Sequence, residues 1–351
     1  MSGYRLVRRV LFTLPAERAH GLAIGSLALI QGTPLEAYLA GRYTVEDPRL
    51  AVETLGNHFP NPVGVAAGFD KNARVPNALG ALGFGHVEVG GVTAQAQAGN
   101  PQPRLFRLTD DRALINRMGF NNDGVEAIAD RLERFETFRV PIGVNIGKSK
   151  DTPLAEAPEE YRRTYEQLAE VADYVVINVS SPNTPGLREL QARGPLEKIV
   201  ASLTDAGAEP LLIKLSPDLT EPAIDEVIEV VETHDLDGVV AVNTTVNRPA
   251  ELTSVHRDEK GGLSGEPLAR TARETVAYVA QQTDRPIIGV GGIDGPERAY
   301  EMIRAGASLV QLYTGLVYEG PSLARQINRG LLDRIERDGF ASVEEAIGVD
   351  Q

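Results

Sequence analysis

Eight short apolar segments recur along this chain, and most are followed by a segment with the pattern of an amphipathic helix. The apolar segments cover residues 63–67, 86–89, 142–146, 174–179, 211–215, 238–242, 286–290 and 309–313. Short β-branched runs of this kind are typical of strands buried on both faces of a parallel sheet. Helical patterns cover residues 159–171, 196–206, 221–233, 267–282, 296–305 and 322–337. Eight such units predict an α/β protein with a closed (β/α)8 TIM barrel, and a doubly wound open sheet is the alternative.

Two regions fall outside this repeat. Residues 4–14 carry apolar side chains at helical spacing with arginines on another side, and a second apolar helix is expected over 16–30. We therefore predict an N-terminal two-helix extension over residues 1–42 and a barrel domain over 43–351. The interval 94–138 is longer than an ordinary connection, which predicts a lid or a small hairpin.

The charge of the chain is unevenly distributed. The net charge is −14, with +3 on residues 1–42 and −17 on the remainder. Nucleic-acid binding through phosphate contacts is therefore not expected. The chain has no cysteine and five scattered histidines, so we predict no disulfide and no metal site. The acidic composition with only six lysines suggests a protein that works at high salt, where screening reduces self-repulsion.

The apolar stretches of the extension are shorter than the roughly 20 residues that cross a bilayer. Short apolar helices with arginines beside them can instead lie in a membrane interface. The alternative is an ordinary helical hairpin packed on the barrel.

Polar residues follow the buried strand pattern in the segment YVVINVSSPNTPGLR, residues 174–188. Asn178, Ser180, Ser181 and Asn183 stand where this strand is expected to end. Catalytic side chains gather at the carboxyl ends of strands in parallel α/β proteins. We interpret Ser181 as a candidate base and the asparagines as groups that hold a substrate. The alternative is a polar loop that caps the strand.

Glycines follow the last two strand patterns. The sequences are GVGGI at residues 289–293 and YTG at 313–315. Loops after strands seven and eight of a barrel commonly bind phosphate through backbone N–H groups and a helix N-terminus. The pair of motifs predicts a phosphate-bearing cofactor, and tight turns without a ligand are the alternative.

Two lysines and several asparagines complete the set of polar residues at strand ends. Lys71 follows the first strand and Lys214 lies inside the fifth, where an ammonium is costly to bury without an anionic partner. Each could face a phosphate, a substrate carboxylate or a reduced flavin ring. The asparagines offer donors and an acceptor each, which suits a flat imide-like molecule; they are Asn116, Asn145, Asn178, Asn183 and Asn243.

These motifs together resemble the quinone-dependent, class 2 dihydroorotate dehydrogenases. The likeness runs in order along nearly the whole chain, over AAGFDKN (66–72), NRMGFNN (116–122), GVNIGK (143–148), INVSSPNTPGLR (177–188), KLSPDL (214–219), NTT (243–245), GGLSGEPL (261–268), GVGGI (289–293) and LVQLYTG (309–315). Class 1 enzymes use a cysteine base, and this chain has none.

The resemblance implies an FMN-bound barrel that oxidises dihydroorotate to orotate in pyrimidine biosynthesis and passes the electrons to a membrane quinone. Ser181 matches the catalytic base. The implied substrate contacts are Lys71, Asn116, Arg117, Met118, Gly119, Phe120, Asn178, Asn183, Asn243 and Thr244. The implied flavin contacts are Ala67, Gly68, Phe69, Asp70, Lys71, Gly91, Asn145, Asn178, Lys214, Val242, Gly265, Gly292, Tyr313 and Thr314.

The resemblance also implies a quinone path between the N-terminal helices and the barrel, with His20 and Arg107 lining it. It implies peripheral attachment to the cytoplasmic side of the cell membrane. One residue departs from the family pattern, which has a threonine or serine where Gly91 stands. We expect weaker FMN retention from this loss of a hydroxyl. The alternative functions are a different phosphate-binding barrel enzyme, such as an aldolase or isomerase, and a membrane-associated binding protein.

Overall fold

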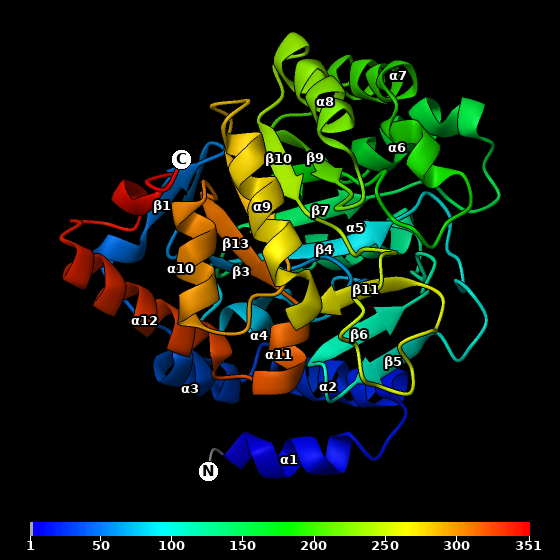
Figure 1. The fold of residues 1–351 in the computed structure, drawn as a ribbon. Helices are drawn as coiled ribbons and strands as arrows, with labels where there is room; N and C mark the ends of the chain where they lie inside the picture. The colour runs from blue at the N-terminus through cyan, green and yellow to red at the C-terminus, as the bar shows by residue number, and fades with distance from the viewer. Residues whose placement is uncertain (1–2) are drawn as a thin grey trace.

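The structure is a computed structural model that describes residues 3–351. A closed barrel of eight parallel strands forms its centre, which confirms the predicted (β/α)8 fold (Figure 1). The strands are β3 (Val63–Val65), β4 (His86–Val92), β7 (Ile142–Ile146), β8 (Tyr174–Ile177), β9 (Leu211–Leu215), β10 (Gly238–Ala241), β12 (Ile287–Val290) and β13 (Leu309–Leu312). Each barrel strand pairs with the barrel strand that follows it in sequence, and the last strand, β13, pairs with the first, β3, to close the barrel.

Helices connect the strands and cover the outside of the barrel. They are α4 (Pro76–Gly80), α5 (Val125–Glu133), α6 (Ala157–Glu166), α7 (Arg193–Thr204), α8 (Glu221–Thr233), α9 (Ala269–Ala280), α10 (Pro296–Arg304), α11 (Thr314–Glu319) and α12 (Leu323–Asp338). Short 3₁₀ turns are η1 (Pro48–Leu50), η2 (Leu154–Glu156), η3 (Leu187–Gln191), η4 (Glu266–Leu268) and η5 (Glu344–Ala346). Each longer helix is amphipathic. One stripe of apolar side chains is buried in the protein core, and the opposite side of the helix faces solvent.

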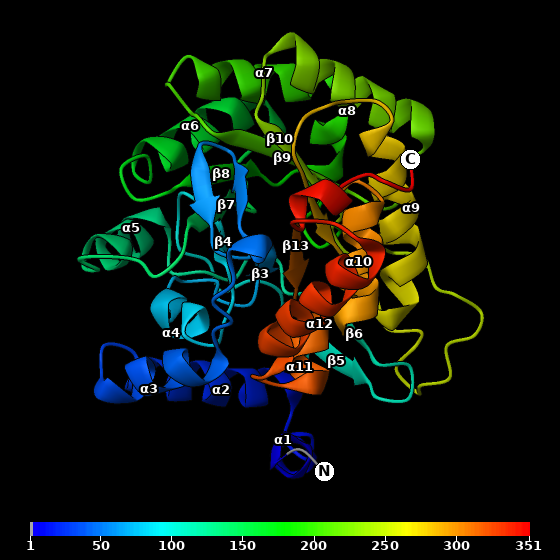
Figure 2. The ribbon, with the colours of Figure 1, turned by 90° about the vertical axis from the view of Figure 1, so that its left-hand side faces the viewer.

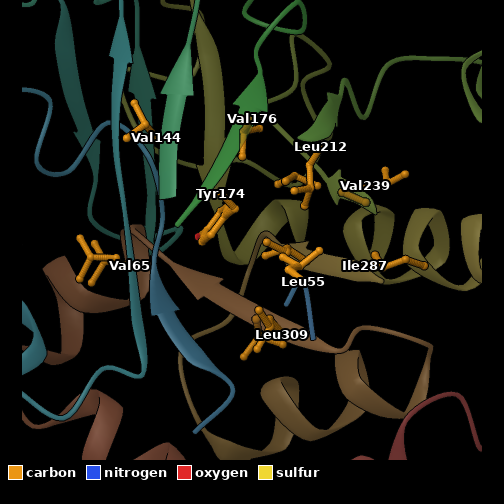
Figure 3. Packing of buried hydrophobic residues seen from close by; sticks show 14 of the residues in the cluster. Leu55, Val65, Val144, Tyr174, Val176, Leu212, Val239, Ile287 and Leu309 are labelled. Atoms are coloured by element: carbon orange, nitrogen blue, oxygen red, sulfur yellow. The ribbon is translucent and has the colours of Figure 1, made fainter. Parts of the chain in front are cut away.

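The barrel strands are buried on both faces, which explains their continuous apolar runs. Figure 3 shows part of this core, where side chains from several strands pack together, among them Tyr174, Leu212 and Leu309. An antiparallel hairpin of β1 (Val52–Thr54) and β2 (Asn57–Phe59) packs beside the core. The Phe59 ring meets the buried His86 ring of β4 edge-on, with 5.5 Å between centroids.

The long interval after β4 contains the predicted hairpin, formed by β5 (Leu105–Leu108) and β6 (Ala113–Asn116). A distant strand, β11 (Gly262–Gly265), pairs with β6 and makes a three-stranded antiparallel sheet. Sequence analysis did not predict this third strand, because its pattern is short and glycine-rich. Helix α5 was also not predicted in this interval.

The N-terminal extension contains three helices rather than the two predicted. They are α1 (Gly3–Leu11), α2 (Ala16–Ile30) and α3 (Pro34–Tyr43). Pro34 was expected only to end the second helix, but it occupies the first turn of α3, where its missing N–H needs no partner. Figures 1 and 2 show α2 and α3 against one side of the barrel, with α1 beyond them. None of the helices over residues 3–351 is both long and apolar enough to cross a membrane.

Candidate active site

A cavity opens at the carboxyl ends of the barrel strands, beside the sheet of β5, β6 and β11. It encloses about 1110 Å³ of empty space, including its open mouth. Most of the predicted site residues line it: Ala67, Gly68, Lys71, Gly91, Asn116, Met118, Gly119, Phe120, Asn178, Ser181, Asn183, Lys214, Val242, Asn243, Thr244, Gly265, Gly292, Tyr313 and Thr314.

Four residues predicted as substrate or flavin contacts do not line this cavity. Asn145 lies directly behind Asn178. Asp70 instead accepts hydrogen bonds from the backbone amides of Arg74 and Val75, at 2.9 and 2.7 Å, and so shapes the loop after β3. The other two residues are Phe69 and Arg117.

The side chain of Arg117 contacts residues outside the cavity lining, and its predicted contact with substrate stays a prediction. Its guanidinium donates to Glu259 at 2.7 Å and stacks over the Phe106 ring at 4.5 Å. Asn116 and Met118, its two neighbours in sequence, line the cavity. Arg117 faces the opposite way because successive side chains of an extended segment alternate in direction.

Asparagine side chains form a connected network in the cavity wall. Asn178 Nδ2 donates to Asn145 Oδ1 at 2.7 Å, and Asn243 Nδ2 donates to Ser180 Oγ at 2.9 Å. Across the cavity, Asn183 Nδ2 donates to Asn116 Oδ1 at 3.1 Å. These bonds orient each amide, and the remaining donors and acceptors can meet the edge of a flat ring.

A buried carboxylate that sequence analysis missed lies beneath this network. Glu88 of β4 has a fully buried side chain and accepts from Asn145 Nδ2 at 2.8 Å and Gln311 Nε2 at 2.8 Å. Lys214 Nζ lies 3.4 Å from Glu88 Oε1, so the lysine has the anionic partner that its burial requires. The sequence signal was a lone glutamate inside the apolar pattern of β4.

Ser181 lies in the cavity wall, and its residue is 8% exposed. Its Oγ accepts a hydrogen bond from the backbone N–H of Asn183 at 3.3 Å. Ser181 therefore lies in the same cavity wall as the lysines and the amides, and its role as a base stays a prediction.

Lys71 lies at the rim between the barrel and α2. Its Nζ donates to the Gly68 carbonyl at 2.6 Å. Burial lowers the pKa of the Lys71 ammonium to about 8, although the nearby Glu17 carboxylate opposes that shift. A lysine with this pKa carries its charge at neutral pH and loses it in mildly alkaline solution.

Free backbone amides gather where the loops after β12 and β13 meet. Within residues 3–351, the amides of Gly292 and Ile293 donate to no protein acceptor. The first amides of α11, at Thr314 and Gly315, have no intrahelical acceptor either. A side chain at Gly315 would collide with the Ile293 carbonyl, so the two loops are in direct contact. This donor set fits the phosphate of a flavin nucleotide.

Gly91 occupies a crowded position rather than an open one. A Cβ atom there would lie 2.6 Å from the Phe120 ring and 3.2 Å from Asn145 Oδ1. The Phe120 ring also approaches Gly147, where a Cβ would lie 3.0 Å away. The missing side chain at Gly91 therefore makes room for the Phe120 ring, and the effect on FMN retention stays a prediction.

Edge-on contacts between aromatic rings connect the extension to the cavity. The His20 ring of α2 meets the Phe69 ring edge-on at 5.1 Å, and Phe69 meets Tyr313 in the same way at 5.6 Å. Burial lowers the pKa of His20 to about 3, so its ring is neutral at pH 7.

Arg107 of β5 holds the turn between α1 and α2. Its guanidinium donates to the carbonyls of Phe12 and Leu14, at 2.9 and 2.7 Å. It also lies over the Phe12 ring, 4.7 Å from the centroid. Both residues predicted for the quinone path thus lie at the boundary between extension and barrel.

In the part of the chain that the structure describes, no cluster of three histidine, aspartate or glutamate side chains could hold a metal ion. A closed parallel barrel with a cavity lined by amide donors at the carboxyl ends of its strands has the architecture of an α/β-barrel enzyme. The model of the dihydroorotate dehydrogenase family matches residues 49–335. The chain belongs to this family.

Curated relatives match the chain over its whole length. Dihydroorotate dehydrogenase (quinone) from Natronomonas pharaonis is 63% identical and covers 100% of both chains. The protein of the same name from Halobacterium salinarum is 56% identical and covers 99% of both. Among solved structures, DHODH from Eimeria tenella in complex with ferulenol is 39% identical, with a TM-score of 0.88 and 95% of both chains covered.

Proposed function

We propose that this chain oxidises dihydroorotate to orotate, with FMN as the hydride acceptor and a quinone as the final electron acceptor, in pyrimidine biosynthesis. Family membership supports a flavin-dependent dihydroorotate dehydrogenase. The observation that carries the assignment of roles is the convergence of Ser181, two lysines and four asparagines on one cavity.

Ser181 acts as the base in this proposal. Its Oγ takes the proton from C5 of dihydroorotate and releases its own hydroxyl proton towards solvent, while the hydride leaves C6 and a C5–C6 double bond forms. Bound FMN supplies the acceptor for that hydride. A serine hydroxyl is a weak base, so the bound ring must acidify the C5 proton. The Asn183 N–H at 3.3 Å supports this step because it stabilises negative charge on Oγ.

The remaining cavity residues would position the two reactants. Asn116, Asn178, Asn183 and Asn243 meet the ring edges, and the Lys71 ammonium meets the substrate carboxylate. Lys214 lies where it would stabilise the anionic reduced flavin, and the amides at 292–293 and 314–315 would hold its phosphate. The other assigned contacts that line the cavity surround these groups, whereas Phe69, Asp70, Arg117 and Asn145 lie outside its lining.

We further propose that residues 1–42 form a membrane-facing extension on the barrel domain, 43–351. Large apolar side chains on α1 and α2 are exposed: Leu6 at 66%, Val10 at 67% and Leu29 at 81%. Such surfaces bind membrane interfaces. A quinone would enter between extension and barrel and approach the flavin past His20, Phe69 and Arg107. The enzyme would then lie on the cytoplasmic side of the cell membrane, as a peripheral protein.

The test is anaerobic reduction of the purified flavoprotein by dihydroorotate, with the reaction monitored through the flavin absorbance. Ser181→Ala should retain FMN and slow this reduction about 10²–10⁴-fold, the usual contribution of a general base. Ser202→Ala, on α7 outside the cavity, is the matched control. A colourless purified protein would refute the assignment and favour another barrel chemistry, whereas near-normal reduction of the Ser181→Ala variant would refute the role of Ser181 as the base.

A further inference from the structure

Arg188 is a half-buried arginine of η3 that lies outside the cavity but contacts two of its loops. Its Nε donates to the Ser180 carbonyl at 3.0 Å, immediately before Ser181. One of its terminal nitrogens donates to the Thr244 carbonyl at 3.2 Å, immediately after Asn243. Within residues 3–351, neither carbonyl accepts a hydrogen bond from any other residue. One guanidinium thus joins the loop after β8 to the loop after β10.

An ion pair connects a third loop, the one after β9, to the same guanidinium. Arg188 Nη1 lies 2.8 Å from Asp218 Oδ2, in the loop after β9, and these side chains are 25% and 13% exposed. Asp218 also accepts from the Val246 amide at 3.0 Å and from Asn247 Nδ2 at 3.1 Å. The carboxylate therefore keeps donors on the β10 loop even without the arginine.

These contacts depend on the shape of the guanidinium. Its planar fork can reach a carboxylate and two carbonyls at once, whereas a lysine ammonium acts as a single compact charge. The backbone at Ser180 and Thr244 is therefore specified by arginine in particular, and not by positive charge alone.

We propose that Arg188 is a positioning residue for the reaction, which fixes the backbone next to Ser181 and Asn243 and so sets the distance between base and substrate ring. The inference rests on the proposed role of Ser181. Misplacement of a reacting group by about 1 Å can cost on the order of 100-fold in rate. The expected effect of losing this contact is therefore on the chemical step more than on binding.

Two conservative variants separate this role from that of an ordinary ion pair. Arg188→Lys can retain the pair with Asp218 but cannot also hold both carbonyls. Asp218→Asn loses the charge of the pair but leaves Arg188 its two carbonyl acceptors. A positioning role through the carbonyls predicts a larger loss for Arg188→Lys, and a structural ion pair predicts the larger loss for Asp218→Asn.

The experiment measures the limiting rate of flavin reduction by dihydroorotate, the Kd of orotate from flavin absorbance, and Tm. Arg188→Lys should lower the limiting rate about 10- to 100-fold and change the orotate Kd less than about threefold. Asp218→Asn should lose less than about fivefold in rate. Arg193→Lys is the control, because the ion pairs of Arg193 with Glu197 and Glu229 lie outside the cavity lining.

An equal or larger rate loss for Asp218→Asn would overturn the proposal, and so would an Arg188→Lys rate within threefold of wild type. If Arg188→Lys does not fold, Arg188→Gln replaces it and the same ordering against Asp218→Asn decides. Ser181→Ala in the same assay keeps the two questions apart. A large loss there with a normal Arg188→Lys rate refutes only the role of Arg188, whereas a normal Ser181→Ala rate refutes the role of Ser181 on which the inference rests. Failure of dihydroorotate to reduce the wild-type flavoprotein would refute the proposed function itself.

Discussion

The N-terminal helices lie beside the barrel (Figure 2), and different kinds of interaction hold these helices and the wall of the barrel cavity. The cavity wall is built from buried polar side chains that bond one another, such as Glu88, Asn145 and Asn178. The extension presents large apolar side chains to solvent, while Ile24 of α2 packs into the barrel core and polar bonds attach α1. Tyr4 of α1 donates to the Val317 carbonyl at 2.7 Å, and Arg8 donates to the Tyr318 carbonyl at 2.7 Å.

This difference indicates a division of roles. Chemistry on a small ring needs donors and acceptors held in one geometry, and buried networks supply that rigidity. Contact with a lipid surface needs exposed apolar area, which a tightly packed wall cannot offer. Changes in the wall should therefore affect stability, FMN and substrate together, whereas changes on the extension should leave all three intact.

Lys214→Met should have the largest effect, because it leaves the fully buried Glu88 carboxylate without its cation. Loss of one partner of a buried pair costs about 3–5 kcal/mol in the free energy of unfolding. Urea unfolding and the flavin content of the purified protein check this. Lys198→Met, on the exposed side of α7, is the control. Unchanged stability and flavin content for Lys214→Met would contradict the proposed difference between the cavity wall and the N-terminal extension.

The pH dependence of orotate binding should follow Lys71. Its pKa of about 8 means that the ammonium is charged below pH 8 and neutral above it. Orotate affinity should therefore be constant below pH 8 and fall up to about tenfold per pH unit above, until the raised pKa of the complex is reached. The measurement is the orotate Kd from pH 6.5 to 9.5. Lys71→Arg should remove the dependence, and a flat wild-type profile would contradict the assignment.

Gly91→Thr should destabilise the wall, although it introduces the residue type that the family usually carries there. The added side chain collides with the Phe120 ring. Overpacking of this kind costs about 1–3 kcal/mol. Gly295→Thr is the control, because no atom lies within 4 Å of a Cβ at Gly295, where the backbone is extended. Equal Tm values for the two variants would show that Phe120 adapts freely.

Leu6→Glu combined with Val10→Glu should have the smallest effect on the fold, below about 0.5 kcal/mol, because both side chains are exposed. Flavin reduction by dihydroorotate should not change. Binding to phospholipid vesicles should weaken at least about tenfold, and turnover with a vesicle-borne quinone should fall with it. Val349→Glu, which changes an exposed apolar residue near the C-terminus, is the control. Vesicle binding equal to wild type would show that the extension is only a packing element.

Much of the barrel could be predicted from local pattern. Short β-branched runs buried on both faces are recognisable in sequence, and eight of them with intervening helices leave few architectures. Residues just after such runs must gather at one end of a parallel barrel. For this reason Ser181, Lys71, Lys214 and the loops at 292 and 314 could be placed together without coordinates.

Other features depend on pairing between distant segments, which no local pattern encodes. The short strand β11 is identified only by its pairing with β6. The direction of the Arg117 side chain and the crowding of Gly91 by Phe120 required the folded backbone. The third helix of the extension was missed because a proline can either follow one helix or begin the next.

The amino-acid sequence by itself determined the barrel, the end at which the chemistry lies and most side chains that reach it, because strand periodicity and strand ends are local properties. Only the tertiary structure decided how those side chains are held. Glu88 meets Lys214, and Arg188 meets Thr244, because the closed barrel brings together loops and strands that lie far apart in the chain.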